Sequence, residues 1–236
     1  MAQRPTAFVT GGTAGIGRAI AFALGRAGWQ VGLCARSGEA VTATVAALQA
    51  EGISAAGHPA DVGVEQDVTR AIGAIASQLG PIELLVNNAG IMRTAPIMEL
   101  SLDDWDQTMA TNVRALFLTT RTVLPGMRRL GRGTIVNVAS LAGKNGFAGG
   151  TAYTASKHAV LGFSKSLMME VRTEGIRVIA ICPGSVETAL RRGGPARRPN
   201  ADRILQPEDV ASMVLAALAL PDRALVSELD IRPNNP

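Results

Sequence analysis

Aromatic side chains are scarce in this sequence of 236 residues, where Phe, Trp and Tyr together make up 3%. Proteins that bind single-stranded nucleic acids stack the bases on aromatic side chains, and the net charge of this chain is only +4. Both features argue against nucleic-acid binding and favour a protein whose arginines serve anionic small molecules. With so few rings, the core is expected to consist of Val, Ile, Leu, Ala and Met.

Cysteine is also rare, and long apolar runs are absent. Cys34 and Cys182 each lie in an apolar segment typical of a buried strand, and no metal-ligand spacing is found, so we expect free buried thiols and no metal site. No apolar run is long enough to span a bilayer, and the first residues lack the pattern of a signal peptide. We therefore expect a cytoplasmic protein without a membrane partner.

What the sequence does contain is a regular alternation of buried-strand and helix patterns. This alternation predicts βαβ units in an α/β fold, a Rossmann-type doubly wound parallel sheet of about seven strands with helices on both faces. We expect one domain over residues 1–236. The predicted strands are Thr6–Thr10, Gln30–Ala35, Ile53–His58, Leu84–Asn87, Thr134–Ala139, Arg177–Cys182 and Ala224–Ile231. The predicted helices are Gly15–Ala27, Gly38–Glu51, Val64–Leu79, Leu102–Leu130, Thr151–Glu174 and Pro207–Leu220.

A glycine-rich loop stands between the first predicted strand and helix, with the sequence Thr10-Gly11-Gly12-Thr13-Ala14-Gly15-Ile16-Gly17. Glycines permit a tight turn and a close backbone approach to a pyrophosphate, and the helix start supplies free N–H groups. A glycine cluster alone can be a simple turn. Between a strand and a helix, it predicts a nucleotide-binding site.

The spacing T-G-x-x-x-G-I-G resembles that of the short-chain dehydrogenase/reductase family, and other motifs follow in the family's order. They are Asn87-Asn88-Ala89-Gly90, Asn112, Ser140, Tyr153, Lys157, Pro183-Gly184 and Thr188. The resemblance covers nearly the whole chain. It implies an oxidoreductase that transfers a hydride between a nicotinamide cofactor and a carbonyl or secondary alcohol.

The end of the second predicted strand bears on the choice of cofactor. An acidic residue there would hold the ribose hydroxyls of NAD, but this strand ends in Arg36, which can pair with a 2′-phosphate. We therefore predict NADP(H) in preference to NAD(H), although a solvated Arg36 is the alternative and the glycine loop has Ala14 where NADP-dependent relatives often have a second basic residue. With the residues that the resemblance implies, the predicted cofactor contacts are Gly11, Thr13, Gly15, Ile16, Gly17, Arg36, Asp61, Val62, Asn87, Ala89, Gly90, Tyr153, Lys157, Pro183, Gly184, Val186 and Thr188.

Four residues form the predicted catalytic group. Tyr153 and Lys157 are four apart on a helix and share a face, so the lysine ammonium is expected to lower the pKa of the phenol. The pair can then donate or accept the proton of the reacting oxygen. The resemblance implies that Ser140 orients the substrate, that Lys157 also binds the nicotinamide ribose, and that Asn112 holds a water near Lys157.

The substrate is less clear from the sequence. The ending Glu228-Leu229-Asp230-Ile231-Arg232-Pro233 resembles family members that act on 3-hydroxy acids and ketones. The segment Arg191–Asn200, with four arginines, two glycines and two prolines, falls in a predicted substrate lid over residues 185–206, with a solvated loop as the alternative.

Two other functions are open. Arg128, Arg129 and Arg132 would suit an acidic carrier protein if the enzyme were a 3-oxoacyl-thioester (acyl carrier protein) reductase. A catalytically silent NADP-binding regulator is the remote alternative. Apolar residues on the predicted helices Leu102–Leu130 and Thr151–Glu174 lead us to expect a homotetramer, with a dimer second.

Overall fold

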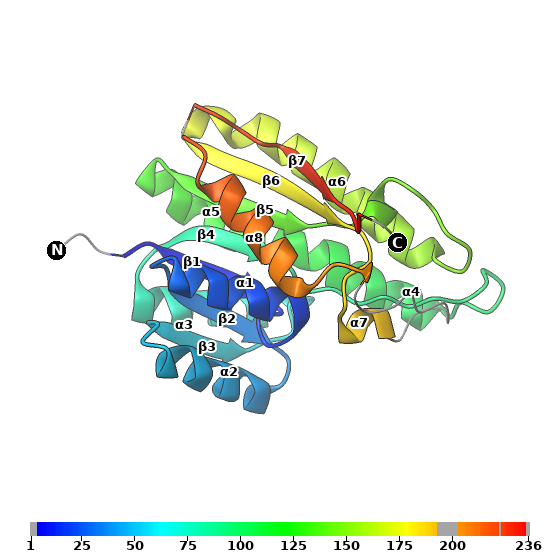
Figure 1. The fold of residues 1–236 in the computed structure, drawn as a ribbon, viewed down its shortest axis with the longest axis horizontal. Helices are drawn as coiled ribbons and strands as arrows, with labels where there is room; N and C mark the ends of the chain where they lie inside the picture. The colour runs from blue at the N-terminus through cyan, green and yellow to red at the C-terminus, as the bar shows by residue number, and fades with distance from the viewer. Residues whose placement is uncertain (1–3, 193–202, 222, 235–236) are drawn as a thin grey trace.

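The computed structural model describes residues 4–192, 203–221 and 223–234. Within these ranges, seven parallel strands form one sheet in the order β3-β2-β1-β4-β5-β6-β7 (Figure 1). This confirms the predicted α/β doubly wound sheet. The strands are β1 Thr6–Thr10, β2 Gln30–Ala35, β3 Ala55–Pro59, β4 Ile82–Asn87, β5 Gly133–Val138, β6 Ile176–Pro183 and β7 Glu228–Ile231.

Helices cover both faces of the sheet. One face packs against α1, α2 and α8, and the opposite face packs against α3, α5 and α6; Figure 1 shows α1 and α8 side by side on the first of these faces. The helices are α1 Gly15–Arg26, α2 Gly38–Ala50, α3 Glu65–Leu79, α4 Leu102–Met109, α5 Ala115–Leu130, α6 Thr151–Val171, α7 Ala189–Arg192 and α8 Pro207–Leu218. Every helix in the described part of the chain is too short or too polar to cross a bilayer.

The core is built from small and aliphatic side chains, as the shortage of aromatics predicts. In β1, Ala7 and Val9 point to one face of the sheet and Phe8 to the other, and all three are buried. Side chains alternate between faces along a strand, so each inner strand contributes to both cores. Cys34 and Cys182 are free and buried, and burial raises the pKa of the Cys34 thiol to about 12.

Several predicted boundaries differ from those in the structure. The helix expected over Leu102–Leu130 is interrupted by a π-helical turn at Ala110–Arg114, which separates α4 from α5. The last strand is shorter than the predicted Ala224–Ile231, because the chain first bonds to the sheet edge at Ser227, whose carbonyl accepts from the Ala180 N–H at 2.9 Å. Ser101 caps α4, with its hydroxyl accepting from the Asp104 N–H at 3.0 Å.

A buried chain of hydrogen bonds joins the sheet to the helices behind it. The Asn137 amide in β5 donates to the Ser164 hydroxyl in α6 at 2.8 Å, and its carbonyl accepts from Asn87 in β4 at 2.9 Å. The Thr119 hydroxyl in α5 donates to the Asn87 carbonyl at 2.6 Å. Asn137 is fully buried. This network fixes the height of α6 over the sheet, and α6 carries Tyr153 and Lys157.

Removing the central amide should therefore lower stability. Asn137→Ala leaves the buried Asn87 amide without its acceptor, so we expect a loss of about 1–3 kcal/mol in the free energy of unfolding, measured by urea denaturation. Asn145→Ala is the matched control, because Asn145 is exposed and the hydrogen bond from its side-chain amide to the Leu141 carbonyl is long at 3.4 Å. Equal losses in the two variants would contradict this role for the network.

Candidate active site

A cleft of about 1360 Å³ opens at the carboxyl edge of the sheet, lined by the segments that follow the seven strands. In open α/β sheets, ligands bind at this edge. Its first wall is the glycine loop. Gly11 has φ +65°, and a Cβ there would lie 3.0 Å from the Ala89 Cα; Gly15 has φ +50°, and a Cβ there would lie 3.1 Å from the Thr188 side chain. Only glycine fits both positions without strain.

A polar clamp holds this loop against the segment after β4. The Thr10 hydroxyl accepts hydrogen bonds from the N–H groups of Asn88 and Ala89, each at 3.0 Å. In return, the Asn88 side-chain amide donates to the carbonyls of Thr10 at 3.0 Å and Gly11 at 3.3 Å. Thr10 and Asn88 belong to two of the sequence motifs but were not among the predicted cofactor contacts or catalytic residues. Only the pairing of β1 with β4 brings them together.

The first turn of α1 opens on the same cleft. Ala14, Gly15 and Ile16 all line it, and the N-cap Ala14 has no side chain that could satisfy the free N–H groups of the turn. Such a helix start attracts anions, because its N–H groups point outward and its dipole is positive at this end.

Arg36 and Asp61 line the part of the cleft beside β2 and β3. Arg36 is exposed and has no ion pair with any described residue, so its guanidinium is available to a ligand. Asp61 differs, because its carboxylate already accepts from the Gly63 N–H at 2.8 Å. Val62, beside it, is buried and also lines the cleft.

Tyr153, Lys157 and Ser140 meet in the middle of the cleft. The Ser140 hydroxyl interacts with the Tyr153 phenol and lowers its pKa. The Lys157 Nζ lies 5.7 Å from the centroid of the Tyr153 ring and donates to the Val138 carbonyl at 2.9 Å. Phe147 packs edge-on to the Tyr153 ring, with centroids 6.4 Å apart. The three predicted catalytic groups are therefore neighbours, with an apolar ring beside them.

Burial controls the protonation of this pair. It lowers the pKa of Lys157 to about 8, because the ammonium loses its hydration. It also raises the pKa of the Tyr153 phenol, and the interaction with Ser140 offsets this only in part. The expected fall in the tyrosine pKa is therefore wrong for the protein without cofactor. The lysine does not counter the burial, since its Nζ is directed to the Val138 carbonyl.

Asn112 lies in the π turn, close to the site but outside the cleft lining. Its side-chain carbonyl accepts from the Ile91 N–H at 2.8 Å, and its amide donates to the Ile91 carbonyl and the Ser156 hydroxyl, both at 2.9 Å. Ser156 precedes Lys157 on α6. Asn112 thus ties the segment after β4 to the catalytic helix, a contact that sequence spacing did not reveal. π turns are frequent at functional sites.

Two of the predicted cofactor contacts lie elsewhere. The Asn87 side chain turns into the buried network with Asn137, and Gly17 lies behind the loop, where a Cβ would come 2.3 Å from the Gly11 carbonyl oxygen. Both positions serve packing and are absent from the cleft lining. The predicted residues that do line the cleft are Gly11, Thr13, Gly15, Ile16, Arg36, Asp61, Val62, Ala89, Gly90, Ser140, Tyr153, Lys157, Pro183, Gly184, Val186 and Thr188.

The arginines considered for a carrier protein lie at the far edge of the sheet. Arg128 donates two hydrogen bonds to Glu174, at 2.6 and 2.9 Å, and Arg132 donates to Glu83 at 2.7 Å. Arg132 comes just before β5 begins, whereas the cleft lies where the strands end. Within one chain these arginines therefore lie at the opposite edge of the sheet from Tyr153, and their part in docking a carrier stays a prediction.

Part of the predicted lid can be described. Val186 bridges to Leu205, and residues Ser185 to Leu190 line the cleft. Residues 193–202, including Arg197 and Arg198, lie outside the described residues.

Comparison with known proteins agrees with this geometry. Residues 5–198 match the family model described as short chain dehydrogenase. A putative ketoacyl reductase of Streptomyces coelicolor is 41% identical over 78% of this chain and 71% of its own length. A monensin polyketide synthase putative ketoacyl reductase of Streptomyces virginiae is 40% identical over 92% of this chain and 85% of its own.

A solved structure has the same fold. The crystal structure of a variant of the actinorhodin polyketide ketoreductase with NADPH superposes with a TM-score of 0.89, at 34% identity, over 98% of this chain and 96% of the other. The glycine loop, the Tyr153–Lys157 pair and these similarities lead to one conclusion. The chain belongs to the short-chain dehydrogenase family and is an oxidoreductase of that family.

Proposed function

We propose that this enzyme reduces the carbonyl group of a small ketone or 3-oxo acid with NADPH, and oxidises the corresponding secondary alcohol in the reverse direction. The observation that carries the proposal is the meeting of Tyr153, Ser140 and Lys157 in a cleft whose other wall is the glycine loop. The ketoreductase whose structure superposes on this chain holds NADPH.

The residues of the cleft fit a dinucleotide phosphate. Gly11 and Gly15 have no side chains that would occupy the space beside the loop backbone. The N–H groups at the start of α1 suit a pyrophosphate. Arg36 is exposed and has no ion pair among the described residues, so it can pair with the 2′-phosphate. The preference for NADP over NAD rests on this arginine.

When bound, NADPH supplies the hydride. The chain supplies the rest. The Ser140 hydroxyl orients the substrate oxygen, and the Tyr153 phenol, whose pKa burial raises, remains protonated at neutral pH and donates its proton to that oxygen. The phenolate left behind, unlike the neutral phenol, would attract the Lys157 ammonium, whose Nζ lies 5.7 Å from the centroid of the Tyr153 ring.

The first test removes the proton donor. Tyr153→Phe keeps the ring and loses the hydroxyl, so we expect turnover to fall by at least about a hundredfold while NADPH affinity, followed by fluorescence titration, changes little. His158→Ala is the control, because His158 lies on the same helix but is exposed and outside the cleft lining. Near-normal turnover in Tyr153→Phe would refute the assigned chemistry.

The second test concerns the cofactor. Arg36→Asp replaces an attraction for the 2′-phosphate with a repulsion, so the ratio of kcat/KM for NADPH to that for NADH should fall by about a hundredfold or more. Arg172→Asp makes the same charge change at an exposed position that does not line the cleft and should leave the ratio unchanged. A wild-type enzyme that prefers NADH would already show the proposal to be wrong.

A second candidate function is the reduction of 3-oxoacyl thioesters. The similarity to the two Streptomyces putative ketoacyl reductases favours it. Steady-state rates with 3-oxobutanoate, with simple ketones and with the N-acetylcysteamine thioester of 3-oxobutanoate would rank the substrate classes. A silent NADP-binding regulator is disfavoured, because the chain retains Ser140, Tyr153 and Lys157 in one cleft.

We also propose assembly into a homotetramer, with a dimer second. Exposed apolar side chains gather on the helical layer of α4, α5 and α6, where Leu102 is 75% exposed, Met169 57% and Phe117 46%. Light scattering should give a tetramer mass, and Phe117→Asp should reduce it because it places a charge in a dry interface. Val64→Asp, at an exposed position before α3, should not. A monomeric wild type would contradict the proposal.

The single domain over residues 1–236, the lid over 185–206 and the cytoplasmic location remain predictions.

A further inference from the structure

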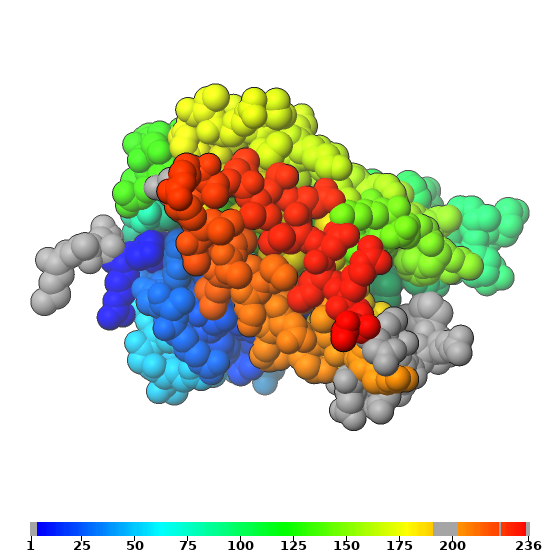
Figure 2. All heavy atoms as spheres, turned by 45° about the horizontal axis from the view of Figure 1, so that its top comes forward, coloured from blue at the N-terminus to red at the C-terminus, as the bar shows by residue number. Residues whose placement is uncertain are grey.

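One basic residue of the cleft has no part in the chemistry described above. Arg232 follows β7, the edge strand, and lines the same cleft as Ser140 and Tyr153. Figure 2 shows the segment around β7 (red) running over the surface between α6 and α8. A charged side chain here reaches both the solvent and the site.

The backbone holds Arg232 close to the reacting groups. The Gly184 N–H donates to the Ile231 carbonyl at 2.8 Å, which seats the next residue, Arg232, beside the turn that follows β6. The Ser140 hydroxyl lies 3.5 Å from the Pro183 carbonyl oxygen in that turn. Ser140 and Arg232 follow strands two positions apart, so their backbones are about 10 Å from each other. An arginine side chain spans most of that gap and leaves room for a ligand of a few atoms.

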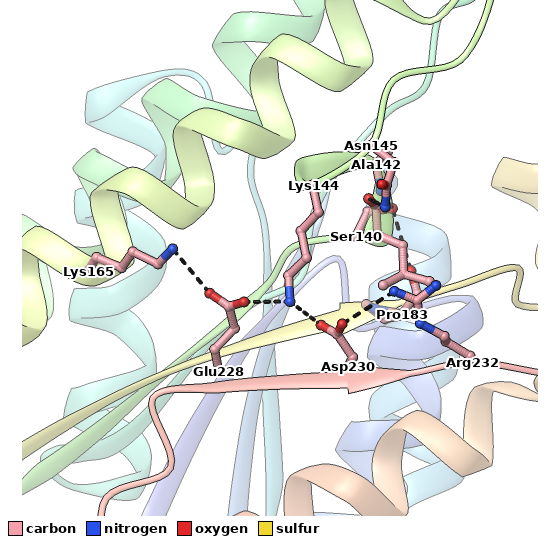
Figure 3. Close-up of polar contacts among 10 residues, drawn as sticks. Ser140, Ala142, Lys144, Asn145, Lys165, Pro183, Glu228, Asp230 and Arg232 are labelled. Atoms are coloured by element: carbon pink, nitrogen blue, oxygen red, sulfur yellow. Dashed lines mark hydrogen bonds and ion pairs between the residues drawn. The ribbon is translucent and has the colours of Figure 1, made fainter.

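The acidic neighbours of Arg232 are already neutralised by other cations. Lys144 contacts the carboxylates of both Glu228 and Asp230, and Lys165 lies 3.5 Å from Glu228 (Figure 3). Lys144 is the main reason that the pKa of Asp230 falls below its ordinary value. The same ammonium lies where a cation held by Cys182, Glu228 and Asp230 would sit, so we propose no metal at this cluster.

Arg232 is consequently held only loosely by its own protein. Among the described residues its one polar side-chain partner is Asp230 at 3.5 Å, at the limit of a hydrogen bond, and its side chain is 59% exposed. In Figure 3 it reaches back toward Asp230, beside Pro183 and Ser140. In this cluster three cations face two carboxylates, and Arg232 is the one of the three that lines the cleft.

We propose that Arg232 is a specificity-determining residue that binds the carboxylate of a short oxo acid, placing the acid's carbonyl at Ser140 and Tyr153. This inference rests on the proposed function and narrows its substrate class. The planar guanidinium pairs with a carboxylate through two parallel hydrogen bonds. Phe147, Leu141 and Met92 also line the cleft, and their apolar side chains suit the carbon chain of the acid.

The test compares 3-oxobutanoate with its methyl ester, which has the same reacting carbonyl but no charge. For Arg232→Gln, the ratio of kcat/KM for acid to ester should fall by about ten- to a hundredfold, mainly through KM for the acid. Arg232→Lys should keep part of this ratio, because lysine has the positive charge but cannot form the two parallel hydrogen bonds. Arg223→Gln removes the same charge from an exposed residue outside the cleft lining and should leave the ratio intact.

A binding measurement that needs no turnover accompanies the kinetics. In the Tyr153→Phe background with NADPH present, 3-oxobutanoate should bind by calorimetry, and adding Arg232→Gln should weaken that binding by a similar factor. The loss should shrink as salt rises, because the pair is partly exposed.

The alternative outcomes separate the two proposals. If Arg232→Gln lowers kcat/KM equally for the acid and the ester, or raises only the KM for NADPH, Arg232 does not select a carboxylate and the inference fails. If the wild type reduces esters, ketones or thioesters but not the acid, the inference fails while the proposed function stands. If no carbonyl compound is reduced, the proposed function itself fails.

Discussion

The hydroxyl of Thr10 is the contact on which the rest of the site depends. It accepts hydrogen bonds from the N–H groups of both Asn88 and Ala89. The Asn88 side-chain amide in turn donates hydrogen bonds to the carbonyls of Thr10 and Gly11. β1 and β4 are neighbours in the sheet, and the chain proceeds from them in opposite directions, to β2 on one side and β5 on the other. The strand ends therefore separate here and leave a crevice. The clamp fixes the width of that crevice, because both of its walls hydrogen-bond to the same few atoms.

A second constraint comes from burial. Lys157 is 5% exposed and Tyr153 8%, so neither can rely on water to stabilise its charge. The Val138 carbonyl at the end of β5 and the Ser140 hydroxyl take over that task. α6 must hold both side chains at fixed depth for this to work. The bonds from Asn137 to Ser164, and from Asn112 to Ser156, attach that helix to the sheet and to the segment after β4.

The sequence predicted what depends on local spacing, and missed what depends on which strands become neighbours. The seven-stranded sheet was predicted correctly, and the glycine loop and the Tyr153–Lys157 pair line one cleft as expected, because periodicity and short motifs encode them. The Asn87 side chain instead enters the buried network, since only the alignment of β4 with β5 places Asn137 opposite it. The π turn at Asn112 depends on tertiary contacts that helix periodicity does not register. The pairing of Arg128 with Glu174 joins residues 46 positions apart, which no motif marks.

The position of Arg232 also depends on which strands become neighbours, and in this case the feature bears on the proposed function. Its place beside the site follows from β7 pairing with β6, with Pro183 opposite Ile231, and this pairing cannot be read from composition or from a motif. The residues proposed to perform the chemistry follow β5 or lie on α6, both tied to the sheet interior. The residue proposed to select the substrate follows β7, the edge strand of the described sheet. Substitutions at that edge leave the clamp at Thr10 and the buried pair untouched, so selectivity can change there without changing the reaction.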